Sequence, residues 1–437
     1  MKKLLLILVA ALAISSVSAQ QRRYNPEPMK KKVAASDKDI ADPKKNVRAT
    51  TWMSRGDTYY EATVDPVSKL RKGLTQEDLV YNYGEPSEKS KEVINEKNYE
   101  KWTFEAFDVF FVEGQTRVSF WNQKIKVLDD GVPTAFEAYK KAVELDPKQE
   151  EKVKPLIEKL VAVEKQRADK AFITADYKGA AQAFAQAYEL AKDPIVGAVD
   201  TISAYNAGYL SVIDENYPMA IKYLNTVKDM GFYNNGDTFK LLHFAYKGVG
   251  DNENAEAILK EGIEKFPENT EYIELLMVLY SNIGKDARDL IPMLEEGIKQ
   301  NPNNYVFQFS RATMYMREQD YENAIEKFKK ALEISPNDFA SNYNLGVAYA
   351  RTNDKRIEEM NTLSIAEQAR YDELKTVVNE TYQTAIPYLL KAHEVNPKDL
   401  ATVELLRNFY FRSRDDSPEA MAAYEKFDAL YKELGGN

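Results

Sequence analysis

The sequence predicts a mainly α-helical protein, a solenoid of about eight helix–turn–helix repeats with a small α+β module inserted in the first repeat. Three observations predict this fold class. From residue 130 onward an apolar pattern of helical periodicity recurs, in most cases every 34 or 35 residues. Strand-like runs are confined to residues 99–127. Beyond the first nineteen residues, no apolar run approaches the ~18 residues that a membrane-spanning helix needs.

The first nineteen residues are typical of a secretory signal peptide. Lys2 and Lys3 precede an apolar run, and small residues at 17–19 form a cleavage site before Gln20. No cysteine follows that site, so we expect an exported, soluble chain without a lipid anchor. A bacterial periplasm is the most natural compartment for it.

Residues 20–48 are expected to form a flexible basic tail. Residues 20–50 hold nine Lys and Arg against four Asp and Glu, a balance of +5, whereas the rest of the mature chain carries −17. Three prolines and few large apolar residues leave this segment too little surface to fold by itself. The tail either contacts anionic phospholipid or an acidic partner, or it is simply a solvated leader.

The repeated pattern is clearest at Ala324, Phe328, Ala331 and Pro336. Offsets of four and three residues put the first three side chains on one helical face, where small residues let a neighbouring helix approach. The proline then ends the helix. Copies of this pattern, three of them without the proline, begin at residues 135, 180, 220, 255, 290, 324, 385 and 420.

An opening helix with its own apolar stripe precedes these closing helices, so the chain from 132 to 437 is predicted to be a solenoid of helix pairs. In the first opening helix, residues 49–64, the stripe contains Trp52, Gly56 and Tyr59. The whole pattern resembles the tetratricopeptide repeat, with its 34-residue period and its W-x₂-L-G-x₂-Y, A-x₃-F and P positions. Arg55 stands where that motif has leucine. The resemblance implies a stack in which each repeat buries its stripe only against its neighbours.

Residues 65–131 separate the two helices of the first repeat. Thr75 can cap a short helix that Gly84 ends, and strand-like runs follow at 99–104, 109–112 and 116–127. Six short motifs in this segment match those of a known family: Gly73-Leu74-Thr75, Leu79, Gly84-Glu85-Pro86, Trp102, Phe110-Phe111 and Val118-Ser119-Phe120. Together they resemble the SmpA/OmlA (BamE-like) module.

That resemblance implies a helical part packed against a three-stranded antiparallel sheet. The best-known members of the family are lipoproteins of the outer-membrane protein assembly machine, but this chain lacks their lipidated cysteine. The module either docks to a second component or merely caps the exposed first repeat of the solenoid.

A second insertion, residues 355–381, explains one repeat spacing of 61 residues. It is polar and helical in pattern, with Ser364 and Glu367 as a capping box. It is expected to lengthen the two helices of its repeat into a projecting hairpin, which is either functional or a tolerated surface insertion.

The composition argues against an enzyme. The chain has no cysteine and two histidines, neither in metal-ligand spacing, so we expect no catalytic residue, no metal and no cofactor. The formal net charge of −10 argues against nucleic acid as a partner, because phosphates need a basic surface.

The candidate binding residues form a second stripe on the opening helices, which line the concave groove in the tetratricopeptide family. Aromatic residues edged with cations suit a peptide or helix that carries apolar and acidic side chains. Alternatively, these aromatic residues contact the helix of the adjacent repeat. The stripe consists of Tyr205, Asn206, Tyr209, Lys240, Phe244, Lys247, Phe309, Met316, Tyr343, Asn344 and Arg351.

The sequence therefore predicts a non-enzymatic, periplasmic scaffold that holds a protein or peptide in this groove. Outer-membrane protein assembly or secretion is the expected setting. A soluble periplasmic holdase tied to no one machine is the alternative function.

Overall fold

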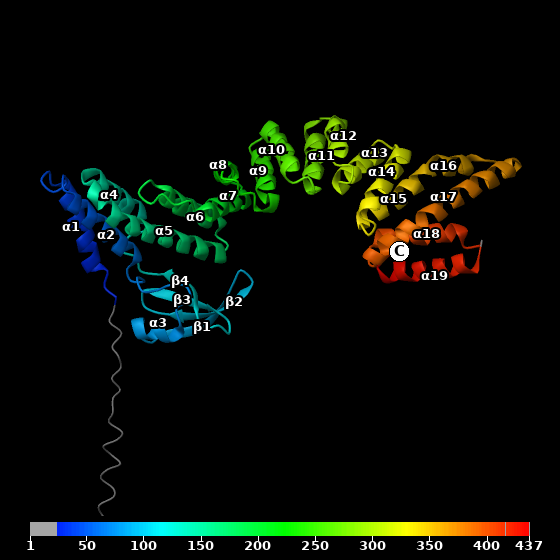
Figure 1. Ribbon diagram of the computed structural model, residues 1–437. Helices are drawn as coiled ribbons and strands as arrows, with labels where there is room; N and C mark the ends of the chain where they lie inside the picture. The colour runs from blue at the N-terminus through cyan, green and yellow to red at the C-terminus, as the bar shows by residue number, and fades with distance from the viewer. Residues whose placement is uncertain (1–23, 416, 437) are drawn as a thin grey trace, which may run out of the picture. The chain divides into compact units, whose positions relative to one another are not determined.

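The computed structural model describes residues 24–415 and 417–436 (Figure 1). The predicted signal peptide, residues 1–19, therefore lies outside the described residues, as do residues 20–23. The described chain forms two compact units, which divide between Val249 and Gly250. They are named the N-terminal unit and the C-terminal unit.

Helix pairs make up most of the N-terminal unit, in which α2 packs on α4, α5 on α6, and α7 on α8. Its helices are α1 (Glu27–Ala41), α2 (Ala49–Val64), α3 (Gln76–Tyr83), α4 (Val132–Leu145), α5 (Glu150–Ile173), α6 (Tyr177–Lys192), α7 (Thr201–Ile213), α8 (Tyr217–Asp229) and α9 (Asp237–Gly248). Short 3₁₀ turns, η1 (Pro147–Gln149) and η2 (Asn234–Gly236), precede α5 and α9.

The expectation of a flexible tail over 20–48 is wrong for the described part of that segment, because α1 packs along α2. Val33 is buried in the core of the first repeat, and Asp37 accepts a hydrogen bond of 2.7 Å from Arg55 Nη1. The prolines do not prevent this helix, since Pro26 and Pro28 stand at its first turn, where no intrahelical N–H bond is lost. The segment folds because α2 supplies the surface that it lacks by itself.

Close contact within the pairs depends on the small residues of the stripe. Gly56 on α2 lies directly against the ring of Tyr139 on α4, which is fully buried. The Tyr139 hydroxyl donates a hydrogen bond of 2.9 Å to Asp57. No side chain larger than hydrogen fits at Gly56 unless that ring moves.

A recurring turn joins opening and closing helices. The residue before the closing helix's cap has a positive φ, as at Glu215 and Gln319. Asn216 then caps α8, and Asp320 caps α14 (Tyr321–Ile334), through their side chains. The left-handed residue turns the chain, and the cap satisfies backbone N–H groups of the first helical turn. These local devices set the spacing between paired helices.

The inserted module is a four-stranded antiparallel sheet in the order β1-β2-β3-β4. Its strands are β1 (Glu88–Ile94), β2 (Lys97–Thr103), β3 (Phe107–Val112) and β4 (Val118–Gln123). One face buries Trp102, Phe111 and Trp121 with Leu79 of α3. The other face packs Tyr99, Phe110 and Phe120 with Ile173 of α5, so the sheet lies between α3 and α5 (Figure 1).

The expectation of three strands is wrong, because β1 is an additional edge strand. It pairs with β2 over seven residues, from Glu88 opposite Thr103 to Ile94 opposite Lys97. Six of its seven residues are exposed, so its sequence lacks the alternation of apolar and polar residues by which a half-buried strand is found. Its charged side chains suit an exposed sheet edge.

The C-terminal unit continues the same architecture, with α13 packed on α14, α15 on α17, and α18 on α19. Its helices are α10 (Asn252–Lys265), α11 (Glu271–Ile283), α12 (Ile291–Gln300), α13 (Tyr305–Arg317), α14 (Tyr321–Ile334), α15 (Phe339–Thr352), α16 (Asp354–Thr362), α17 (Gln368–Val395), α18 (Leu400–Ser413) and α19 (Pro418–Glu433), with 3₁₀ turns η3 (Ala287–Leu290) and η4 (Ile365–Glu367). Ala324, Phe328 and Ala331 are all fully buried, as their spacing predicts. The predicted fold class, a solenoid of helix pairs with an inserted sheet, is confirmed.

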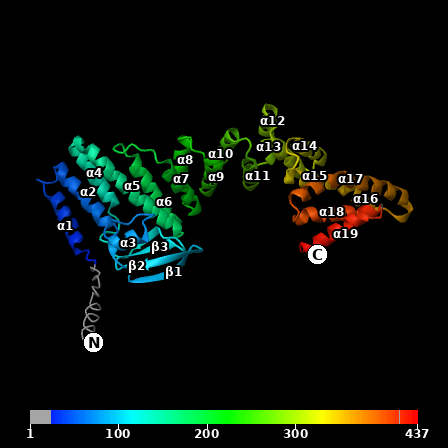
Figure 2. The same cartoon turned by 60° about the horizontal axis from the view of Figure 1, so that its bottom comes forward.

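The second insertion forms a helical hairpin in which α16 lies alongside the first half of α17, as both views show (Figure 2). Its second helix is one continuous segment of 28 residues. Its first helix is interrupted at Asn353, whose buried side chain donates a hydrogen bond of 3.2 Å to the Val378 carbonyl. At the tip, Glu367 accepts hydrogen bonds from the backbone N–H and the hydroxyl of Ser364, which forms the capping box.

Candidate protein-binding surfaces

Two tyrosines of the predicted stripe form a stacked pair on α7. The rings of Tyr205 and Tyr209 are 6.3 Å apart with 4° between their planes. Phe232 meets the Tyr205 ring edge to face at 5.4 Å, and Asn234 donates a hydrogen bond of 2.7 Å to its hydroxyl. Asn206 is half-buried. Tyr205 is thus held in place from the segment before α9, while Tyr209 keeps 39% of its surface exposed.

Helix α9 supplies the next three residues of the stripe. Phe244 is 42% exposed and touches His243 with its ring edge, at 5.3 Å between centroids. Lys240, one turn earlier, forms an ion pair of 2.9 Å with Asp237, and Lys247 is exposed. Burial raises the pKa of Tyr205, and the hydrogen bond from Asn234 opposes that rise. Helix α9 also packs directly against α7. The structure therefore brings the α7 and α9 parts of the stripe together.

In the C-terminal unit, Phe309 and Met316 are half-buried and pack against a core. Both pack on the cluster of Ala312, Ala324, Phe328 and Leu345. The Phe309 ring lies 5.8 Å from that of Phe328. These contacts with α14 and α15 agree with the alternative, contact with neighbouring helices, while a groove role for the two half-buried residues stays a prediction.

The three predicted stripe residues on α15 differ in their exposure. Tyr343 stacks on Phe339 at 6.0 Å and packs partly into the core around α17. Asn344 is half-buried, and exposed Arg351 pairs with Asp354 at 3.3 Å. The neighbouring Asn342 is the fully enclosed asparagine, and its side chain donates hydrogen bonds to the carbonyls of Pro336 and Asp338.

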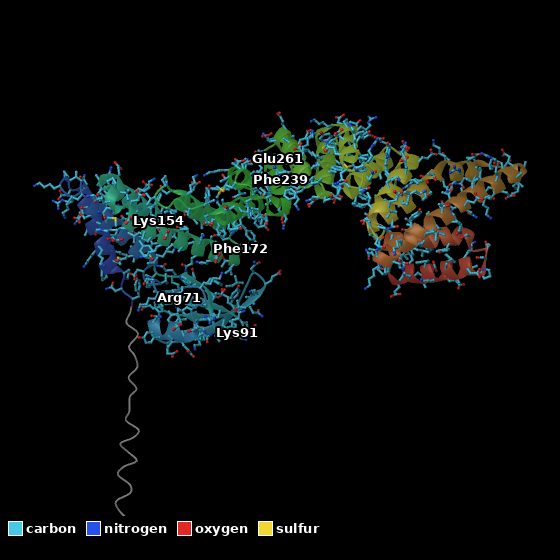
Figure 3. All side chains as sticks on the ribbon, viewed as in Figure 1. Arg71, Lys91, Lys154, Phe172, Phe239 and Glu261 are labelled. Carbon is cyan, nitrogen blue, oxygen red and sulfur yellow. The ribbon has the colours of Figure 1, made fainter. Side chains whose placement is uncertain are left out.

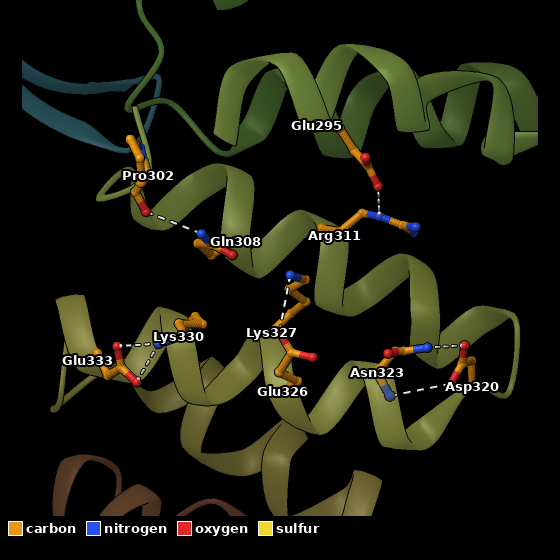
Figure 4. Close-up of polar contacts among 10 residues, drawn as sticks. All are labelled: Glu295, Pro302, Gln308, Arg311, Asp320, Asn323, Glu326, Lys327, Lys330 and Glu333. Atoms are coloured by element: carbon orange, nitrogen blue, oxygen red, sulfur yellow. Dashed lines mark hydrogen bonds and ion pairs between the residues drawn. The ribbon is translucent and has the colours of Figure 1, made fainter. Parts of the chain in front are cut away.

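Two buried polar side chains on α13 were missed by the sequence reasoning (Figure 4). Gln308 and Arg311 are each 6% exposed. Gln308 Nε2 donates to the Pro302 carbonyl at 3.1 Å, while its Oε1 has no hydrogen-bond partner. Arg311 Nε lies 3.5 Å from Glu295, and its guanidinium covers the Tyr315 ring at 3.8 Å. Polar residues inside an apolar stripe are the only signal that could have revealed them.

Gln308 opens into a pocket of about 670 Å³ between α13 and α14. Its charged lining is already paired, Lys327 with Glu326 at 3.3 Å and Lys330 with Glu333 at 3.0 Å (Figure 4). A pocket with balanced, mutually paired charges offers little selectivity for a charged ligand. It does not identify a ligand class.

A second set of functional candidates lies where α5 meets the sheet module, in a region from which the sequence singled out no binding residue. Glu164 on α5 is 1% exposed, and burial raises the pKa of its carboxyl to about 7 although Arg167 opposes that rise. Arg167 donates to Glu164 at 2.8 Å and to Asp130 at 2.9 Å. This network ties α5 to the segment that leaves the module, beside a cleft lined by several cations.

Within residues 24–415 and 417–436, no group of three or more acidic or histidine side chains is placed to hold a metal ion. Likewise, none of the helices in the described part of the chain combines the length and the apolar character of a membrane span.

Comparison with known proteins identifies the repeat. Residues 312–353 match the TPR repeat family. Residues 312–353 therefore form a tetratricopeptide repeat. It is 25% identical over 163 residues to human (Homo sapiens) interferon-induced protein with tetratricopeptide repeats 2, covering 36% of this chain and 33% of that protein. The chain spans about a third of the length of the curated relatives it matches.

Solved tetratricopeptide-repeat structures are also similar. One is a TPR repeats protein from Bacteroides fragilis, at 16% identity and a TM-score of 0.31, over 62% of this chain and 98% of that one. Another is the C-terminal part of a TPR repeat-containing protein from Cytophaga hutchinsonii, at 16% identity and a TM-score of 0.39, over 61% of this chain and 94% of that one.

Proposed function

We propose that this protein is a non-enzymatic scaffold that holds a protein or peptide partner on the face formed by α7 and α9. Tetratricopeptide repeats generally act as non-catalytic scaffolds for protein–protein interaction. The observation that carries the proposal is the pair of exposed aromatic side chains on that face, Tyr209 at 39% and Phe244 at 42%. Aromatic residues held on rigid helices are the commonest anchors of protein interfaces.

The surroundings of this pair indicate the chemistry of its partner. Tyr205 is fixed by Phe232 and Asn234, so the stacked tyrosines offer a rigid surface that loses little conformational entropy on binding. Lys247 is exposed and adds positive charge along the same helix, whereas Lys240 is paired with Asp237. A peptide or helix with apolar and acidic side chains fits this face.

The setting we propose is the bacterial periplasm, and there outer-membrane protein assembly or secretion. The support is the signal-like sequence of residues 1–19 and the resemblance of residues 65–131 to the BamE-like module. In this proposal the module docks to a second component of the machinery. The alternative function is a holdase that binds many unfolded proteins.

Photo-crosslinking in living cells tests this function. A photoreactive phenylalanine analogue at position 209 or 244 should form crosslinks to one or a few proteins, whereas the same analogue at Tyr371, 37% exposed on α17, should not. Mass spectrometry of the purified protein should find a mature chain that begins at Gln20. A chain that keeps residues 1–19 in the cytoplasm would contradict the periplasmic setting.

The crosslinking pattern also separates the two functions. A scaffold gives the same few products at all growth temperatures, while a holdase gives many products that increase after heat shock. Equal crosslinking from positions 209, 244 and 371 would remove the binding site from the α7–α9 face.

A further inference from the structure

The inserted module creates a cleft that neither the repeats nor the sheet would form alone. It has a volume of about 680 Å³, within the range typical of ligand sites. Its apolar wall includes Tyr60 and Val64 from α2 and Val163 from α5, and β4 lines the module side. All of these elements belong to the N-terminal unit, so the cleft is an internal feature of that unit.

The cleft is strongly cationic. Seven basic residues line it against two acidic ones, Asp129 and Asp169, in a protein whose formal net charge is −10. Three of the seven are neutralised by ion pairs: Lys72 with Asp169, Lys165 with Asp200, and Arg167 with Asp130 and Glu164. The other four have no carboxylate within 4.0 Å in the described part of the chain: Arg71, Lys126, Lys159 and Lys170.

Lys126 and Lys170 form the centre of this positive charge. Lys170 Nζ donates a hydrogen bond of 2.7 Å to the neutral Asn122 side chain, and it is half-buried. Burial lowers the pKa of Lys170, and the like charge of Lys126 lowers it further, with Asp176 opposing. Two repelling ammonium groups beside an apolar wall are stabilised most by an added anion.

The unpaired cations are also spread along the cleft. Arg71 belongs to the module. Lys159 precedes Lys170 on α5, and its ammonium lies 5.9 Å from the Tyr60 ring. A single small anion would reach one of these groups. An extended chain with several carboxylates would reach them in succession and would place apolar side chains against Tyr60 and Val163.

We propose that this cleft binds an acidic segment of a partner polypeptide, with its carboxylates at Lys126 and Lys170 and its apolar side chains on the wall formed by Tyr60, Val64 and Val163. The inference rests on the proposed function as a protein-binding scaffold and adds a second site to it. It also gives the inserted module a role in forming a binding surface.

Fluorescence anisotropy on the mature full-length chain tests the proposal. The probe is a short labelled peptide of alternating Glu and Phe, compared with the same peptide carrying Gln for Glu. The acidic peptide should bind about tenfold more tightly than its Gln counterpart, and added salt should weaken it more. The double variant Lys126→Gln, Lys170→Gln should weaken the acidic peptide about tenfold.

The matched control is Lys152→Gln, Lys154→Gln, which removes the same charge from exposed positions of α5, the helix that carries Lys170. Lys154 lies near the start of α5, and Phe172, two residues after Lys170, lies near its end (Figure 3). This control should bind the acidic peptide like the unmodified protein. Arg71→Gln, on the exposed module side, is a second variant that leaves Lys170 and its hydrogen bond intact and should weaken binding less.

Equal binding of the two peptides would overturn the proposal, and so would an equal loss of affinity in the control and double variants. Displacement of the peptide by inorganic phosphate at equal concentration would also contradict it. Stronger binding to anionic phospholipid vesicles than to the peptide would do the same. The proposed binding face on α7 and α9 is tested separately. Phe244→Ala should reduce crosslinking at position 209 and leave the affinity for the acidic peptide unchanged. Crosslinking that persists while peptide binding fails would remove the cleft site alone.

Discussion

The two insertions of this chain differ in what they add to a repeat. The module at residues 65–131 brings its own core on both sheet faces and leaves a cationic cleft against α5. The hairpin at residues 355–381 brings no separate core, since Met360, Leu374 and Val378 extend the cluster that packs α17 on α18. An insertion with its own core can create a surface that the repeat lacks, whereas an insertion that extends an existing core lengthens the repeat.

Each insertion interrupts a repeat in which a glycine of the opening helix contacts the closing helix. These two glycines, Gly56 and Gly346, allow a matched pair of substitutions. Gly56→Ala would drive its new methyl group into the Tyr139 ring, and Gly346→Ala into the Leu389 side chain. We expect Gly56→Ala to destabilise its repeat by about 2–3 kcal/mol and Gly346→Ala by about 1–2 kcal/mol. The ring is rigid and is held by its bond to Asp57, whereas leucine can change rotamer.

Hydrogen exchange of α2–α4 and α15–α17 measures these two losses separately, because repeats open locally. Ser54→Ala, an exposed position on α2, is the control and should leave exchange unchanged. If Gly346→Ala destabilises its repeat as much as Gly56→Ala does, the stiffness of the partner side chain does not determine the loss of stability.

The sequence was sufficient for features that repeat and insufficient for features that depend on a single tertiary contact. Gly56, Ala324 and Phe328 lie where the periodic pattern puts them, because each repeat must bury the same stripe. Strand β1 was missed since an exposed edge strand has no alternation, and α1 was missed since Val33 becomes buried only after α2 is in place. The spread of cations along the cleft depends on how the module docks, which no local pattern encodes.

Glu164 links the module to the repeats and predicts a pH effect on the stability of the N-terminal unit. The pKa of this carboxyl is about 7 in the folded chain and about 4.3 when unfolded. The folded state therefore binds the proton more tightly, so this contribution to stability is complete below pH ~4.3 and is lost as the pH rises to about 7. The loss amounts to roughly 3–4 kcal/mol.

Glu164→Gln removes this titration. Whatever its baseline stability, the variant should gain on the unmodified protein between pH 4.5 and 7, and then keep a constant difference above about pH 8. Thermal unfolding followed across this pH range measures the gain. Glu158→Gln, at an exposed position of the same helix, should track the unmodified protein, and a parallel pH profile for Glu164→Gln would mean that the carboxyl titrates normally.

The hairpin tip predicts the smallest effect. Ser364→Ala removes the hydroxyl that donates 2.7 Å to Glu367, but it keeps the backbone N–H bond of 3.0 Å to the same carboxylate. Loss of a cap costs about 0.5–1 kcal/mol, and the tip lies beyond the buried residues Met360 and Leu374. We therefore expect faster hydrogen exchange at residues 362–370 alone, with no change in the global unfolding midpoint. A lowered midpoint would mean that the tip supports the α15–α17 core, and the contrast between the two insertions would then rest on the module's cleft alone.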